Sequence, residues 1–309
     1  METNDRKTIH ALTPNSIDCL LQQSSYSEKY KLLTESVLMM GEQNPLVKTA
    51  MQSNVEYTQS VKGKGFITSV DISNLNGTCN NPALYNSLQE LYVIADINPR
   101  LTVSRNKNGM VKEIKNMKAM WNEWYCWQNS KLNVFLPNKR KQELFINNFE
   151  HGLKKLPFAL GRNLQYMLLF PECYRFKDYP SIDDKSSGKI YVSRFVENMQ
   201  IPHWLSKESY ERTAQGMKIA MFSVLPDGVE IYPKSFYKKN LPHFSADDYH
   251  FSICTEYLFD PDTSKIIHGK LLLCERLHTN FYYKMEISMS IVPSTDERLI
   301  GNHHSNLNA

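Results

Sequence analysis

The chain has 309 residues, of which 41% are hydrophobic and 22% charged, and it carries a net charge of +4. These values are typical of a globular protein that can bury a core without disulfide or metal support. So mild a charge weighs against a nucleic-acid-binding protein, and no apolar run reaches the length of a membrane span. The first residues also lack the apolar segment of a signal peptide, so we expect a cytoplasmic protein.

Catalytic and metal-binding motifs are absent from the sequence. The six cysteines form no CxxC pair and no close cluster with histidine, which argues against a zinc site. There is no GxSxG, HExxH or phosphate-binding glycine motif. We therefore expect no metal, no cofactor and no assignable catalytic residue. An enzyme whose active site assembles from distant positions stays open as an alternative.

The first part of the chain mixes strand and helix patterns. Residues 30–40 fit neither period, whereas residues 55–73 predict two strands around a turn at Gly63 and Gly65. Residues 74–82 have the composition of a loop, and residues 83–95 have the leucine spacing of a helix. A tight hairpin is predicted next, over residues 101–114, with Asn108-Gly109 as its turn.

Three of the four tryptophans, Trp121, Trp124 and Trp127, follow this hairpin within seven positions. Helical spacing places them on one face of a helix that Asn116 can cap. Exposed together, they would form a patch as large as soluble monomers tolerate, so we expect them to be covered. Packing within the chain is the first interpretation; a partner protein and a small apolar ligand are the alternatives.

Two further helices are predicted over residues 138–156, after Pro137, and over residues 158–170. In the first, Phe145, Phe149, Leu153 and Leu156 repeat at helical spacing, and Pro157 is expected to end it. The first turn of this helix carries three cations, which oppose the helix dipole. They suggest either an acidic partner or a solvated turn: Lys139, Arg140 and Lys141.

Residues 177–189 are polar and contain proline, glycine and serine, which predicts a linker. Beyond it the hydrophobic period changes to two, as in antiparallel strands over residues 250–259, 265–277 and 281–291. Another hairpin is expected over residues 217–232, with its turn at Pro226-Asp227-Gly228. In the last strand, alternate apolar residues are candidate ligand contacts: Phe281, Tyr283, Met285 and Ile287.

The strands before and after residues 260–264 should pair as a hairpin with one polar face. In any even register Cys254, Cys274, Glu256, His268 and Lys270 lie on the same face. A catalytic or metal site could be built from such residues. An ion pair between Glu256 and Lys270 beside buried thiols explains them as well, and we prefer that interpretation.

The segment from about residue 84 to 174 resembles uncharacterised cytosolic proteins of Bacteroidota. In that family a hairpin with an Asn-Gly-type turn leads into an Ile-x-Asn sequence and a tryptophan-bearing helix. The matching residues here are Gly109, Ile114, Asn116 and Trp121. The resemblance implies a bacterial origin and a family without an assigned reaction, and it transfers no catalytic residue.

These patterns predict an α+β fold with a helical N-terminal part, which includes a few strands, followed by a C-terminal antiparallel meander. The expected division is a mixed domain at 1–176, a linker at 177–189, a β domain at 190–295 and a flexible tail at 296–309. The many aromatic and methionine residues favour a non-catalytic protein that binds another protein, as an adaptor, accessory or immunity component of a bacterial assembly. The alternative is a β-cup that binds a small apolar ligand.

Overall fold

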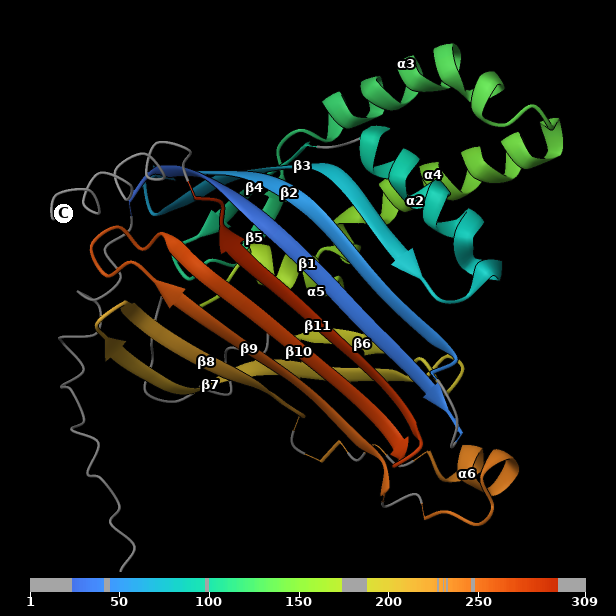
Figure 1. The fold of residues 1–309 in the computed structure, drawn as a ribbon. Coiled ribbons are helices and arrows are strands. Elements are labelled where there is room, and N and C mark those ends of the chain that lie inside the picture. The colour runs from blue at the N-terminus through green and yellow to red at the C-terminus, as the bar shows by residue number, and fades with distance from the viewer. Residues whose placement is uncertain are drawn as a thin grey trace, which may run out of the picture.

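A single antiparallel sheet dominates the computed structural model, which describes residues 24–41, 45–97, 100–173, 188–226, 228–229, 231, 233–245 and 248–293. Its eleven strands lie in the order β5-β4-β3-β2-β1-β11-β10-β9-β8-β7-β6 (Figure 1). The bounds are β1 Tyr26–Met40, β2 Val47–Lys62, β3 Gly65–Cys79, β4 Arg100–Asn106, β5 Val111–Ile114, β6 Lys189–Val192, β7 Gln200–Thr213, β8 Gly216–Val224, β9 His250–Phe259, β10 Ile266–His278 and β11 Phe281–Ile291.

The predicted fold class, a helical N-terminal part followed by a separate meander, is wrong. β1 pairs with β11 along eleven positions, from Tyr30 opposite Ile291 to Met40 opposite Phe281, so strands from both parts of the chain share one sheet. The period of β1 is hidden because Thr34 is buried on the inner face while Leu33 points outward and is 39% exposed. Mixed polarity on both faces removes the alternation by which a strand is recognised.

The hairpin predictions succeed where the turn residues are distinctive. β2 and β3 join around Gly63, and β4 and β5 join around Gly109, which has a φ of 92° as the predicted turn requires. Residues 74–79, expected in a loop, instead continue β3. The hairpin expected at Pro226 is also wrong, because β8 pairs with β7 before that turn and with β9 after it.

The described helices lie mainly at one end of the sheet. They are η1 Pro82–Leu84, α2 Tyr85–Ile97, α3 Met117–Phe135, α4 Lys139–Ala159, α5 Leu164–Leu169 and α6 Lys234–Asn240. Figure 1 shows α2, α3 and α4 grouped beside β3, with α3 and α4 forming an antiparallel helical hairpin. Pro157 lies inside α4 and does not end it, and the predicted helix over residues 158–170 reduces to the short α5.

Asn116 precedes α3 as predicted, but its side chain does not cap the helix. Its Oδ1 accepts a hydrogen bond from the Thr102 backbone N at 2.9 Å, and its Nδ2 donates to the Arg100 backbone O at 2.9 Å. The side chain therefore attaches the start of α3 to β4, and this fixes where the helical hairpin leaves the sheet.

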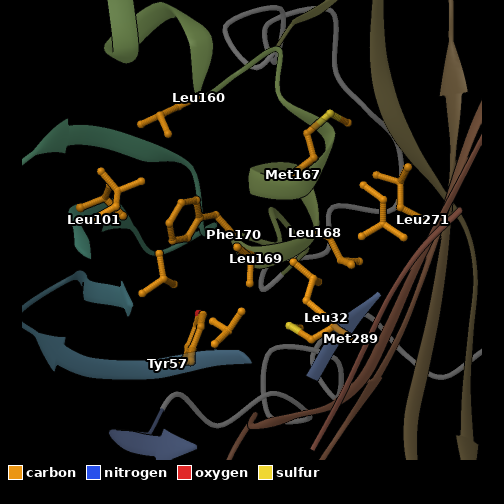
Figure 2. Packing of buried hydrophobic residues seen from close by; sticks show 14 of the residues in the cluster. Leu32, Tyr57, Leu101, Leu160, Met167, Leu168, Leu169, Phe170, Leu271 and Met289 are labelled. Carbon is orange, nitrogen blue, oxygen red and sulfur yellow. The ribbon is translucent and has the colours of Figure 1, made fainter. Parts of the chain in front are cut away.

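The helix α5 forms the centre of the core. Leu168 and Leu169 are completely buried, and the sheet curls around them so that Leu101 and Leu271 lie on opposite sides of the helix (Figure 2). Gly269 of β10 permits the close approach, because a Cβ there would lie 3.1 Å from Leu168 Cδ1. We call α5 and Phe170 the plug of the sheet.

Hydrogen bonds to backbone carbonyls hold the plug in place. The Tyr257 hydroxyl donates to the Met167 O at 2.9 Å, and Arg105 Nη2 donates to the Pro171 O at 2.5 Å. The Arg105 guanidinium is buried and also lies near the Phe66 and Phe170 rings. The sheet thus supplies donors to a carbonyl in the last turn of α5 and to the Pro171 carbonyl just after the plug.

Most of the predicted linker, residues 177–187, lies outside the described residues, as does the tail at 296–309. Among the helices that the structure describes, none combines the length and the apolar character needed to cross a membrane.

A candidate ligand-binding groove

A groove of about 920 Å³ lies between the helices and the sheet. Its floor is the inner face of β3 and β4, and its walls come from α2, α3 and α4, with the start of α5 at one end. The volume falls in the range of small-molecule sites. Most of the lining is apolar: from the sheet Val70, Ile72, Leu75 and Leu101, and from α2 Leu91, Ile94 and Ala95.

The groove-facing side of α4 runs the length of the helix. Its lining residues recur three and four positions apart, which places them on one face: Lys141, Leu144, Phe145, Asn148, Phe149, Gly152, Leu153 and Leu156. From Lys141 to Leu156 this face extends about 22 Å at the helical rise. The helical spacing of Phe145, Phe149, Leu153 and Leu156 predicted this apolar face, but nothing in the sequence analysis indicated a groove beside it.

Gly152 interrupts this stripe and leaves part of the groove empty. Asn148 and Leu156, one turn before and one turn after it, both line the groove. A Cβ built on Gly152 would meet no atom within 4 Å. The glycine is not required for packing, and a larger side chain at this position would occupy space that the protein leaves free.

The tryptophan stripe forms the core of the helical hairpin behind the groove. Trp124 is completely buried, with its ring stacked on Phe149 at 4.2 Å and near Trp127 at 5.8 Å. Trp121 and Trp127 are half-buried. Phe145 and Phe149 contact Trp124 and also line the groove, so Trp124 lies one layer of side chains behind it.

A few polar side chains accompany the apolar lining: Gln89, Glu90, Lys141, Asn148 and Gln165. Lys141 and Glu90 take part in none of the ion pairs between described residues. Tyr166, at the α5 end, has a pKa raised by burial, so its hydroxyl stays protonated. The described residues form no cluster of three or more side chains suited to a metal ion. The groove can therefore offer an apolar surface with a few hydrogen-bonding groups.

The exposed cations predicted in the first turn of α4, Lys139, Arg140 and Lys141, do lie there. The Asn138 Oδ1 caps this helix by accepting from the Lys141 backbone N at 3.1 Å. Only Lys141 lines the groove, and Lys139 and Arg140 lie outside it.

The alternative ligand contacts on β11 face the inner side of the sheet, in another part of the molecule. Tyr283 is 8% exposed and Ile287 1%, whereas Phe281 and Met285 are half-buried. None of the four is among the residues that line the groove. Tyr283 lies under the Arg194 guanidinium, 5.4 Å from the ring centre, and burial raises its pKa.

Beside this region a buried carboxylate, that of Glu275 on β10, collects hydrogen bonds from several segments. The Tyr191 hydroxyl donates to it at 2.9 Å, the Arg194 backbone N at 2.9 Å and the Tyr249 hydroxyl at 3.1 Å, and Ser193 Oγ donates as well. Burial, together with the charge of Glu275, raises the pKa of Tyr191 and of Tyr249. The cluster attaches β6 and the following loop to the inner face of the sheet.

The shared polar face predicted for β9 and β10 exists, with Lys270 opposite Glu256 in the register. The ion pairs are different from the expected one, because Lys270 contacts Glu286 at 2.7 Å and Glu256 contacts Lys218 at 2.9 Å. Cys254 and Cys274 are half-buried. The adjacent strands β8 and β11, which flank this hairpin in the sheet, provide the closer partners.

Sequence reasoning missed the floor and the α2 wall of the groove. Leu75 lies in the segment interpreted as a loop, and Val70 and Ile72 were assigned to a strand without a covering layer. Leu91 belongs to a predicted helix, and its 45% exposure in the structure is the sign that this helix face is incompletely covered. The α4 repeat was the signal in the sequence that predicted the apolar α4 wall.

Comparisons with known proteins give weak structural matches. No family model matches the chain, and no curated protein matches it. One solved structure, "Lipid-protein interactions in lipovitellin", matches 88% of this chain and 25% of its own length, with a TM-score of 0.40 and 9% identity. DynF, from the dynemicin biosynthesis pathway of Micromonospora chersina, matches 90% of this chain and 86% of its own, with a TM-score of 0.21 and 8% identity. The chain thus spans only a quarter of the lipovitellin structure.

Proposed function

We propose that the protein binds one elongated apolar small molecule, such as a fatty acyl chain, in the groove between α4 and β3–β4. The supporting observation is the groove itself: a space of about 920 Å³ with a mostly apolar lining that opens to solvent. Apolar surface left open to water costs free energy, roughly 25 cal/mol per Å², and an apolar ligand removes that cost. The stripe of apolar side chains along α4 faces this empty space, so a ligand there would cover it.

The length of the groove indicates which class of ligand would fit it. About 22 Å of α4 lines it, which suits an extended chain better than a compact ring system. The polar side chains are few, as in sites that bind mainly through apolar contact and use single polar groups to orient the ligand. Lys141 provides a cation for a carboxylate or another acidic head group.

Native mass spectrometry of the purified chain after incubation with stearic acid tests the proposal. We expect a one-to-one adduct. The variant Gly152→Met places a side chain in the groove, so we expect its affinity for stearate to fall at least tenfold. The neighbouring variant His151→Met is the matched control, because His151 is exposed and does not line the groove.

The absence of an adduct with the unmodified chain would contradict the proposal, as would equal binding by Gly152→Met and the unmodified chain. Circular dichroism of both variants establishes that they are folded. Loss of binding in His151→Met to the same extent would show that the effect is not specific to the groove, and would also count against it.

The protein-binding interpretation stays a prediction. Its main support in the sequence was the tryptophan stripe, and Trp124 already packs against the aromatic side chains of α4. The open groove gives the small apolar ligand the stronger support.

A further inference from the structure

The turn that joins α3 and α4 combines exposed cations with exposed apolar side chains. Within residues 131–144 there are four basic residues against one acidic residue, Glu143. The basic side chains are all exposed. Val134 is 83% exposed and Leu144 62%, the largest and third largest values among the large hydrophobic side chains that the structure describes. We call this surface the hairpin tip; its basic residues are Lys131, Lys139, Arg140 and Lys141.

The hairpin tip projects away from the sheet, so a flat partner can reach it without contacting the rest of the molecule (Figure 1). It also lies at the mouth of the groove, because Lys141 and Leu144 belong to both. The net charge of the whole chain is small, whereas at the hairpin tip four exposed basic side chains stand against one acidic residue. Cations beside exposed apolar side chains are the chemistry that recognises the surface of an anionic lipid bilayer.

We propose that the hairpin tip docks on anionic membrane surfaces. Lysine and arginine side chains attract anionic head groups, and Val134 enters the boundary between head groups and acyl chains. The attraction falls off within about 8 Å at physiological ionic strength, so only the tip takes part. Docking would place the mouth of the groove at the bilayer surface. Membrane binding itself does not depend on the groove having a ligand.

Co-sedimentation with vesicles tests this proposal on the full chain. We expect binding to vesicles of phosphatidylcholine mixed with phosphatidylglycerol, no binding to pure phosphatidylcholine, and weaker binding as salt is raised. The double variant Lys139→Gln, Arg140→Gln should lower the partition coefficient about 30-fold, from the usual contribution of two surface cations. Val134→Gln should lower it up to about tenfold by removing an apolar contact.

The matched control is the double variant Lys238→Gln, Lys239→Gln on α6, which removes two exposed cations from another part of the molecule. It should bind within twofold of the unmodified chain. None of Val134, Lys139 and Arg140 lines the groove, so stearate binding should be unchanged in the tip variants. This separates failure of membrane docking from failure of the proposed ligand binding.

Equal binding to neutral and anionic vesicles would overturn the proposal, as would equal effects of the tip and α6 variants. Absence of vesicle binding together with tip-dependent capture of an acidic peptide such as polyglutamate would also overturn it, and would assign the tip to an acidic protein. Neutral glutamine in the first turn of α4 removes cations that oppose the helix dipole, so loss of folding is not expected in the double variant.

Discussion

The two parts of the sheet's inner face differ in how they are covered. Around β10 and β11 the plug sits directly on the sheet, and Leu168, Leu169 and Ile287 are sealed from water. Beside β3 and β4 the cover is formed by α2, α3 and α4, which leave a groove of about 920 Å³. Both parts use the same alternation of inward apolar side chains, so the strand pattern does not decide whether the space above it is core or cavity. The covering helices decide it.

The difference also appears in the polar contacts. In the sealed part, Tyr257 of β9 donates a hydrogen bond to the plug, and Glu275 of β10 receives bonds from β6 and its loop. At the groove, Asn116 attaches the start of α3 to β4, the Tyr92 hydroxyl of α2 donates to the Gly77 O of β3 at 3.1 Å, and aromatic side chains stack between α3 and α4. We therefore expect stability to depend on the sealed part and ligand binding to depend on the open part.

The largest expected effect is in the plug. Leu168→Ala removes a completely buried side chain and leaves a cavity, so the free energy of unfolding should fall by about 3–5 kcal/mol. Leu144→Ala, at the groove mouth where the side chain is 62% exposed, should change it by less than about 0.5 kcal/mol. Urea denaturation of both variants measures the contrast. Similar losses in the two variants would mean that the two regions do not differ as proposed.

The hydrogen-bond cluster of Glu275 should show the next largest effect. Tyr191→Phe removes one donor to the buried carboxylate and should destabilise the protein by about 1.5–3 kcal/mol. The aromatic ring that stacks on Phe251 is kept, so the packing is unchanged. Tyr125→Phe, on the exposed side of α3, is the control and should have no measurable effect. A value for Tyr191→Phe equal to the control would show that the cluster does not hold β6 in place.

A pH effect is expected at His203, which is 2% exposed and whose Nε2 has no hydrogen-bond partner among the described residues. Burial lowers its pKa below the usual 6.5, so below about pH 6.5 the unfolded chain binds a proton that the folded chain does not. This histidine's contribution to stability is therefore fully present above pH 6.5 and decreases as the pH falls, by at most about 1.4 kcal/mol per unit.

His203→Phe should reduce the dependence of stability on pH between 6.5 and 5, because phenylalanine does not titrate and can keep the edge-on contact with Phe251. Denaturation at several pH values measures the slope. An unchanged slope would assign the pH dependence to other histidines, of which His250 and His268 also have pKa values lowered by burial.

The smallest effect is expected at Gly152, in the open part. Gly152→Met should raise the free energy of unfolding by about 0.5–1 kcal/mol, because glycine is unfavourable inside a helix and the new side chain meets no atom at its Cβ. If Gly152→Met raises the free energy of unfolding and also weakens stearate binding, the loss of binding cannot be due to loss of stability. A loss of stability would show that the space beside Gly152 is needed for packing.

The sequence predicted most local elements but not how they assemble. Turns with distinctive residues, such as Asn108-Gly109, and the alternating strands β9 to β11 were identified because their patterns are local. The pairing of β1 with β11 joins residues about 250 positions apart in the sequence, and the mixed polarity of β1 left no period to recognise. Long-range pairing of this kind leaves little trace in a single sequence.

The candidate site was predictable only in part, for a related reason. The α4 repeat identified an apolar helix face, and helical spacing correctly placed Trp124 on a buried face. Periodicity shows which side of an element is apolar, but it does not show whether another side chain fills the space opposite. That the space beside Gly152 and beside the exposed face of α2 is unfilled becomes visible only in the three-dimensional arrangement.

The most direct test measures where an apolar chain binds. Dibrominated stearic acid quenches tryptophan fluorescence at short range. Trp124 contacts Phe145 and Phe149, which line the groove, whereas Trp204 lies on β7. We predict saturable quenching that persists in Trp204→Phe, disappears in Gly152→Met and is absent with unbrominated stearate. Quenching that disappears in Trp204→Phe but persists in Gly152→Met would place the ligand elsewhere and contradict the assignment of the groove.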